Sequence, residues 1–274
     1  MENYLIKEVG SKYSSRYRVY ISYIHDLISP FHDIPLYHNV SSPYITVINE
    51  IPRFENAEFK IQCGEGLNPI KQEEYDGEPL FVPNIFPTKG YPWNQGKIPQ
   101  TWEDPNKKDD DTNKCGDNEP LDVIEIGTRR KNIGEVYVAK VIGCIGLLKD
   151  HICDWKIIVI DINDPMAKLI NEPKDINEAH LEFIGQWLKN YKVSDGKKRN
   201  KLAFDGKCMD KEFTYNIIQK SHEKWKYLMM NDDIGNDISK FRQCDIGLKI
   251  KDMGVKLSDS TPNISLSGFK YVYP

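Results

Sequence analysis

The chain has 274 residues, of which 39% are hydrophobic and 11% aromatic, an ordinary composition for a globular protein with a substantial core. The formal net charge of −4 argues against a general nucleic-acid-binding protein, which would carry a strong basic excess. No stretch has the length of a membrane span and the first residues resemble neither a signal nor a transit peptide, so we expect a cytoplasmic protein without membrane insertion.

The first half of the chain predicts strands joined by loops. Residues 16–24 (RYRVYISYI) and 44–52 (YITVINEIP) are rich in β-branched and aromatic residues, which is typical of strands. The next segment, FENAEFKIQ, continues as a strand with Glu58 and Lys60 on one face, because side chains two residues apart point the same way. Residues 61–113 are rich in Pro, Gly and Asn and predict loops and short strands.

The second half of the chain predicts three strands and then two helices. The strands are LDVIEIG, EVYVAKVIGCIGLL and DWKIIVIDI. Residues 175–192 begin with an aspartate that can cap a helix, and residues 211–230 carry apolar side chains at helical spacing. The polar residues 231–274 are expected to wrap the surface. With no repeat and no linker, residues 1–274 are predicted to form one domain, a β-barrel with helices on its outside.

The segment GDNEPLDVIEIG, residues 116–127, carries an unusual density of acids. Asp117, Glu119 and Asp122 lie within six positions around a proline. Carboxylates crowded in this way repel one another unless a cation shares their site. Mg²⁺ is a hard ion that takes oxygen ligands and often holds phosphate as well, so the segment predicts a magnesium site.

Six segments of the chain, in the same order, resemble the soluble family I inorganic pyrophosphatases, in particular their eukaryotic branch. These segments are FHDIPLY, EIPRFENA, FPTKGYPWNQGKIPQTWEDP, GDNEPLDVIEIG, CDWKIIVIDINDP and YKVSDGKKRNKLAF. The family hallmark Asp-x-Asp-Pro-x-Asp corresponds to residues 117–122, and the resemblance covers about residues 5–230. It implies an α+β, mainly β fold, a five-stranded OB-like closed barrel with helices outside, whose open end gathers Mg²⁺ around pyrophosphate.

The resemblance also implies roles for individual residues. A hydroxide attacks the highly charged pyrophosphate only where metals and cations neutralise that charge. By position, Asp117, Asp122 and Asp154 match metal ligands, and Glu119 matches the carboxylate that positions the attacking water. The positions that hold phosphate oxygens or line the site are matched by Lys156, Tyr191, Lys192 and Tyr91, and an outer acid by Glu50.

Several site positions depart from the family pattern. They are Glu58 and Lys60 (charges reversed), Glu119 (for aspartate), Leu80 (for a phosphate-clamping arginine), Gln95 (for tyrosine), Lys149 (for a metal-binding aspartate) and Ile152 (for an acid). An ammonium about 4 Å from a divalent ion opposes metal binding by several kcal/mol, and a lost arginine fork removes about 2–3 kcal/mol. An extra methylene displaces a carboxylate by roughly 1 Å, which can cost about a hundredfold in rate.

Three hypotheses follow from these substitutions. The first is a protein with weak or lost hydrolytic activity, retained as a structural or binding component; pairing of Lys149 with a site acid would favour it. The alternative is a working Mg²⁺-dependent diphosphatase that binds pyrophosphate and phosphate, supported by the retained aspartates and by a Glu58–Lys60 exchange that keeps both charges. A third is another phosphohydrolase, favoured only if Leu80 and Ile152 open an apolar pocket. A homodimer and incorporation into a larger assembly both stay open.

Overall fold

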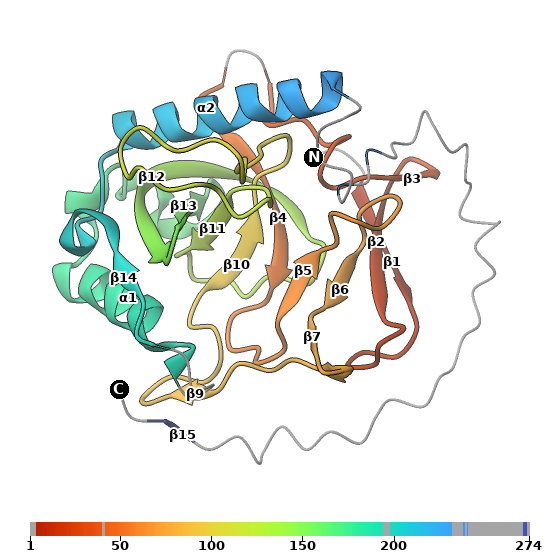
Figure 1. The fold of residues 1–274 in the computed structure, drawn as a ribbon, viewed down its shortest axis with the longest axis horizontal. Helices are drawn as coiled ribbons and strands as arrows, with labels where there is room; N and C mark the ends of the chain where they lie inside the picture. Colours follow the sequence, from red (N-terminus) through yellow and green to blue (C-terminus); the bar gives the residue numbers. More distant parts are fainter. Residues whose placement is uncertain are drawn as a thin grey trace.

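The structure, a computed structural model, describes residues 4–39, 42–193, 198–231, 238, 240 and 271–272. It is mainly β with two α-helices, and the strands form two principal sheets (Figure 1). The strands are β1 (Tyr4–Val9), β2 (Arg18–Tyr23), β3 (Asp26–Ile28), β4 (Ile45–Ile51), β5 (Phe59–Ile61), β6 (Ile70–Gln72), β7 (Glu74–Tyr75), β8 (Glu78–Pro79), β9 (Asn84–Ile85), β10 (Asn94–Lys97), β11 (Asp122–Glu125), β12 (Val136–Lys149), β13 (Ile152–Asp161), β14 (Lys201–Leu202) and β15 (Tyr271–Val272).

Five strands close into a barrel. They pair in the order β13–β11–β10–β4–β12, and the long strand β12 pairs with β13 to complete the ring. All of these pairs are antiparallel except β11–β13, which is parallel. Every residue of β4, β10 and β11 is buried, as expected of strands covered on both faces. The five-stranded barrel predicted from the resemblance is therefore confirmed.

The second sheet lies beside the barrel and is built from the N-terminal part of the chain. Its strands run in the order β1–β2–β6–β5, with β3 paired to β2 (Figure 1). In the view of Figure 1, β5 lies at the side of this sheet that faces the barrel. This position matters for the site, because β5 carries Lys60.

The helix α1 (Glu178–Asn190) packs against aromatic side chains of the core. Trp187 makes an edge contact with Trp93, with ring centroids 4.8 Å apart. The sequence predicted a helix that starts at Asp175, but Asp175 ends the 3₁₀ turn Pro173–Asp175 and Ile176 is extended. Asn177 caps α1 instead, with its side chain accepting a hydrogen bond from the Ala179 amide.

The helix α2 (Lys211–Met230) has the bounds that the sequence predicted and crosses the barrel above β12 and β13 (Figure 1). Asp210 caps it by accepting a hydrogen bond from the Phe213 amide. Ile217 and Ile218 are buried in the same apolar cluster as barrel residues of β12 and β13. Within the described ranges, no helix is long and apolar enough to cross a membrane.

The predicted surface course of residues 231–274 lies mostly outside the described residues. At the end of this segment, β15 pairs in parallel with β9, with Tyr271 opposite Asn84.

Candidate active site

A row of three charged residues crosses the barrel where β10 ends and β11 begins. Lys97 is paired directly with Asp122 on the neighbouring antiparallel strand, and Asp122 is paired with Lys156 on the parallel strand β13. Side chains directly opposite one another share a face of the sheet, so the register alone brings these three together. The Lys97 ammonium lies 2.9 Å from Asp122 Oδ1, and the Lys156 ammonium contacts Asp122 Oδ2.

The row continues in both directions through shared carboxylates. Asp154 Oδ2 accepts hydrogen bonds from Lys156 and from Lys149, each at 2.7 Å. On the other side, Glu119 accepts from Lys97 at 2.7 Å and from Lys60 at 2.8 Å. We call this set of alternating ammonium and carboxylate groups the charge ladder; in order it comprises Lys60, Glu119, Lys97, Asp122, Lys156, Asp154 and Lys149.

Glu119, Asp154 and Lys97 of the charge ladder stay ionised although they are largely buried. Burial disfavours the charged form of each group, but the facing charges outweigh it. The Lys97 and Lys60 ammoniums hold the pKa of Glu119 below its ordinary value, and Lys149 and Lys156 do the same for Asp154. Conversely, Asp122 and Glu119 raise the pKa of Lys97 well above its usual range against the effect of burial.

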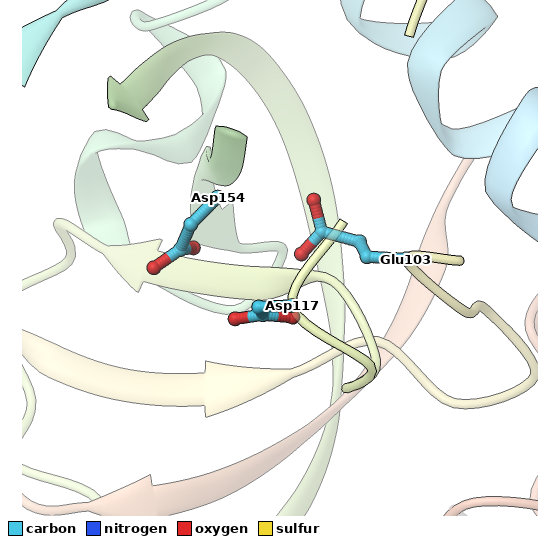
Figure 2. Close-up of side chains that lie close together, drawn as sticks. All are labelled: Glu103, Asp117 and Asp154. Atoms are coloured by element: carbon cyan, nitrogen blue, oxygen red, sulfur yellow. The ribbon is translucent and has the colours of Figure 1, made fainter. Parts of the chain in front are cut away.

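A cluster of three acids lies beside the ladder. Glu103, Asp117 and Asp154 offer oxygen atoms that all lie within 4.8 Å of one another, and Figure 2 shows their side chains close together. Two backbone hydrogen bonds hold the loops together, from the Gly116 amide to the carbonyl of Asp104 and from the Asn118 amide to that of Glu103. A Cβ at Gly116 would lie 2.2 Å from the carbonyl carbon of Glu103, so this approach requires glycine.

The acid cluster has the electrostatic signature of a cation site. Burial raises the pKa of Asp117 to about 7, and the charges of Asp154 and Glu119 add to the effect. Glu103 Oε2 and Asp154 Oδ1 are buried and have no hydrogen-bond partner among the residues that the structure describes. Buried carboxylate oxygens without donors are costly, and a divalent cation would satisfy them.

Asp117, Asp122 and Asp154 line a pocket, and aromatic rings close it on the side of α1. Trp187 stacks on Tyr191 at 4.9 Å between centroids and lies 5.1 Å from Tyr91. The Lys192 ammonium lies 3.5 Å from Glu58 Oε1 near the opening. The cavity that remains has a volume of about 40 Å³.

The chain matches the family model "Inorganic pyrophosphatase" over residues 47–226. It is 51% identical over 228 residues to the inorganic pyrophosphatase of Encephalitozoon cuniculi and covers 82% of both chains. For the Neurospora crassa protein of the same name, the identity is 44% over 230 residues, with 82% of this chain and 79% of the relative covered. The chain belongs to the inorganic pyrophosphatase family.

Solved pyrophosphatase structures have the same fold. The Schistosoma japonicum pyrophosphatase superposes with a TM-score of 0.83 at 39% identity, with 85% of this chain and 84% of that chain covered. The truncated vacuolar soluble pyrophosphatase of Trypanosoma cruzi, determined in complex with PPi, gives a TM-score of 0.76 at 34% identity, covering 84% and 93%.

These relatives overturn the prediction of a catalytically impaired protein. Relatives with up to 51% identity over four-fifths of the chain are named inorganic pyrophosphatase, which favours the active enzyme. The substitutions do not act as independent losses of charge balance, because the substituted residues pair with one another and with the retained aspartates. Lys149 does pair with a site acid, Asp154, but it enters a ladder in which every ammonium has a carboxylate partner.

Most residues predicted for the pyrophosphatase site line one pocket. They are Glu50, Glu58, Lys60, Tyr91, Gln95, Asp117, Asp122, Lys149, Asp154, Lys156, Tyr191 and Lys192. Glu119 joins them through Lys60 and Lys97. The exchange of charge between Glu58 and Lys60 keeps both side chains at the pocket, since Lys60 reaches Glu119.

Leu80 and Ile152 do not line this pocket. The carbonyl of Leu80 accepts a hydrogen bond from the Glu58 amide, and Ile152 pairs with Lys149 where β12 turns into β13. The apolar pocket required by the third hypothesis is therefore not present among the described residues, which argues against a different phosphohydrolase.

Two residues of the pyrophosphatase site were missed in the sequence. Lys97 lies two positions after Gln95 on the same strand, so the alternation of strand side chains could have placed it in the pocket region. Glu103 belongs to the quoted segment PQTWEDP but was assigned no role. Both oxygens of Asp122 contact ammonium groups, whereas Glu103 takes part in the acid cluster. The metal-ligand role of Asp122 stays a prediction.

Proposed function

We propose that the protein is a Mg²⁺-dependent inorganic pyrophosphatase that hydrolyses pyrophosphate to two phosphates. One observation carries this proposal: ammonium groups suited to phosphate oxygens and carboxylates suited to a divalent cation face the same pocket of a pyrophosphatase barrel. The family name points to pyrophosphate as the substrate, and the combination of ammonium groups and carboxylates suits the same substrate. The complex of the related Trypanosoma cruzi enzyme with PPi supports the same substrate.

Mg²⁺ fits the donors of the acid cluster. All are carboxylate oxygens, the ligands that Mg²⁺ prefers. Glu103 Oε2 and Asp154 Oδ1 have no hydrogen-bond partner among the residues whose positions are described, and a bound cation would satisfy them. We propose that Glu103, Asp117 and Asp154 hold the ion. When bound, it supplies Lewis-acid charge and lowers the pKa of water.

The side chains of the chain itself bind and orient the substrate. The ammoniums of Lys156 and Lys192 would hold phosphate oxygens by charge-assisted hydrogen bonds. Burial raises the pKa of Tyr91 well above its usual range, so its hydroxyl keeps its proton and can donate to phosphate. Tyr191 stacks on Trp187 and presents its ring to the same pocket.

Glu119 is proposed to position the attacking water. Hydrogen bonds from Lys60 and Lys97 fix its two carboxylate oxygens, and these ammoniums keep it ionised. A fixed, ionised carboxylate can accept a hydrogen bond from water and aim the lone pair of the water oxygen at phosphorus. The extra methylene of Glu119 relative to aspartate thus lets it reach between the two lysines.

A steady-state assay tests the proposal. Purified protein is mixed with pyrophosphate and millimolar Mg²⁺, and released phosphate is measured against Asp117→Asn. We expect turnover by the unchanged protein that the variant lacks. Phosphate release no faster than that of the variant, from protein with native circular dichroism, would exclude the proposed function.

Three further expectations from the sequence belong to this proposal. Residues 1–274 are proposed to act as one domain, which is supported by a core cluster that joins residues of both sheets and of α1. A homodimer is proposed from the resemblance alone, and light scattering tests it. The cytoplasmic location likewise stays a prediction, which fractionation of cells tests.

A further inference from the structure

We infer that Lys97 and Lys149 act as built-in cations of the charge ladder, so that the pocket binds pyrophosphate without a divalent cation. The inference rests on the proposed function, because it concerns the same pocket and the same substrate. It differs in assigning part of the charge neutralisation to ammonium groups rather than to metal ions.

Lys97 has the surroundings of a bound cation. Its ammonium lies 2.7 Å from Glu119 Oε2, 2.9 Å from Asp122 Oδ1 and 3.1 Å from the carbonyl oxygen of Pro120. Two carboxylates and one backbone carbonyl are a donor set that a hard cation would also take. The side chain is only 2% exposed, so this positive charge is fixed inside the site.

Lys149 provides the corresponding charge at the opening. Its ammonium shares Asp154 Oδ2 with Lys156, at 2.7 Å, and its side chain is 34% exposed. A partly exposed ammonium can turn from a carboxylate to an entering phosphate at little cost, because its stem is flexible. The buried Lys156 then keeps Asp154 neutralised.

The ladder itself carries one more ammonium than carboxylate. Four ammoniums, those of Lys60, Lys97, Lys149 and Lys156, face three carboxylates, those of Glu119, Asp122 and Asp154. Lys192 and Glu58 form a further ion pair at the pocket, which adds no net charge. Replacing one ammonium by a neutral side chain would cancel this excess and leave at least one carboxylate with a single ammonium partner instead of two.

Titration calorimetry of pyrophosphate into metal-free protein in EDTA tests the inference. The informative variant is Lys149→Met, since its partly exposed side chain can be removed without opening the core. The matched control is Lys12→Met, because Lys12 makes an ion pair of the same kind with Glu55, at 2.8 Å and 33% exposed, outside the pocket. Thermal unfolding verifies that both variants are folded.

We expect the unchanged protein and Lys12→Met to bind pyrophosphate in EDTA with equal affinity. Lys149→Met should bind about ten- to a hundredfold more weakly, the loss of one hydrogen bond to a charged group. No binding by the unchanged protein in EDTA, or equal binding by Lys149→Met, would overturn the inference.

A second variant reports on metal binding without reference to turnover. Lys149→Asp replaces the ammonium beside Asp154 by a carboxylate, so we expect it to bind more Mn²⁺ per chain than the unchanged protein, as counted by electron paramagnetic resonance. An unchanged Mn²⁺ count would contradict the inference. The two proposals fail separately: turnover with Mg²⁺ but no metal-free binding removes only the inference, whereas metal-free binding without turnover removes only the proposed function.

Discussion

The barrel strands β11 and β13 carry buried charges towards both of their ends, and the two ends accommodate buried charge differently. At one end lies the charge ladder, in which Lys97, Asp122 and Lys156 pair across the strands. At the other end lie Glu125, at the end of β11, and Asp161, at the end of β13.

At the Glu125 end, backbone amides, neutral side chains and one buried lysine satisfy the acids. Glu125 accepts hydrogen bonds from the Asn94 side chain at 2.7 Å and from the Gly127 amide at 2.8 Å. Asp161 Oδ1 accepts from the Asn163 amide at 2.8 Å, while its other oxygen pairs with Lys131, which is 1% exposed. These partners all belong to the fold itself.

At the ladder end, oxygens are left over for a ligand. Glu103 Oε2 and Asp154 Oδ1 have no hydrogen-bond partner in the described part of the chain. The pKa shifts show the same contrast: burial and neighbouring acids raise that of Asp117 to about 7, whereas amides of Thr128 and Met166 lower that of Asp164 against the effect of burial. Acids held by amides stabilise the fold, and acids crowded by other acids are suited to a cation.

The largest effect is expected for Asp154→Asn at the ladder end. The amide cannot replace the charge that binds two lysines and contributes to the acid cluster, so kcat should fall by about a thousandfold. Phosphate release under saturating pyrophosphate and Mg²⁺ measures it. A kcat within tenfold of that of the unchanged protein would contradict the proposal that the acids of the ladder end serve the reaction and those of the Glu125 end serve the fold.

The matched change at the other end is Asp161→Asn. It leaves the buried Lys131 ammonium without its main charge partner, so the free energy of unfolding should fall by about 3–5 kcal/mol. Urea titration measures this fall. The kcat/KM of the folded variant at low temperature should stay within about twofold, and a selective loss of activity would show that this end also serves the reaction.

A pH dependence of stability is expected from Glu50, a pocket acid with one amide donor, the Ile61 N–H at 2.6 Å. Burial raises its pKa from 4.5 to about 8, and the charges of Asp122 and Glu119 add to this. The folded protein therefore binds a proton that the unfolded chain releases, so stability falls as pH rises from about 4.5 to about 8.

Glu50→Gln should lack this part of the pH dependence. Its free energy of unfolding relative to the unchanged protein should rise by at least about 1.4 kcal/mol, one pKa unit, between pH 5 and pH 8.5. Urea titrations in EDTA at the two pH values give the difference. A difference that does not change with pH would mean that Glu50 is ionised in the folded protein.

The smallest effect is expected for Asp164→Asn, next to the Glu125 end. Asp164 accepts hydrogen bonds from the Thr128 hydroxyl at 2.8 Å and from the Met166 amide at 2.9 Å. Removing its charge should cost about 1 kcal/mol at pH 7. The pKa of Asp164 is lower in the folded protein than its ordinary value of 3.8, so the stability that its charge contributes is lost as the pH falls below that value. The stabilities of Asp164→Asn and of the unchanged protein should therefore converge in acid. Thermal unfolding at both pH values tests the convergence.

Much of the fold followed from local patterns. The alternating and apolar runs gave the barrel strands, and apolar spacing gave α2 with its observed bounds. The start of α1 was misplaced because Asp175 and Asn177 are both good caps, and the choice depended on Pro173, which begins a separate 3₁₀ turn.

The sequence by itself determined which groups are present: three aspartates in recognisable segments, the lysines and the glycine that lets the acid loop approach Glu103. Only the tertiary structure decided how they balance, because the net charge at a site depends on strand register. Pairing of β10 with β11 and of β11 with β13 places Lys97 and Lys156 beside Asp122. The substituted residues Lys60, Glu119 and Lys149 thereby belong to one connected ladder of paired charges. Electrostatic energy depends on the distances between charges, which the order of residues along the chain does not give.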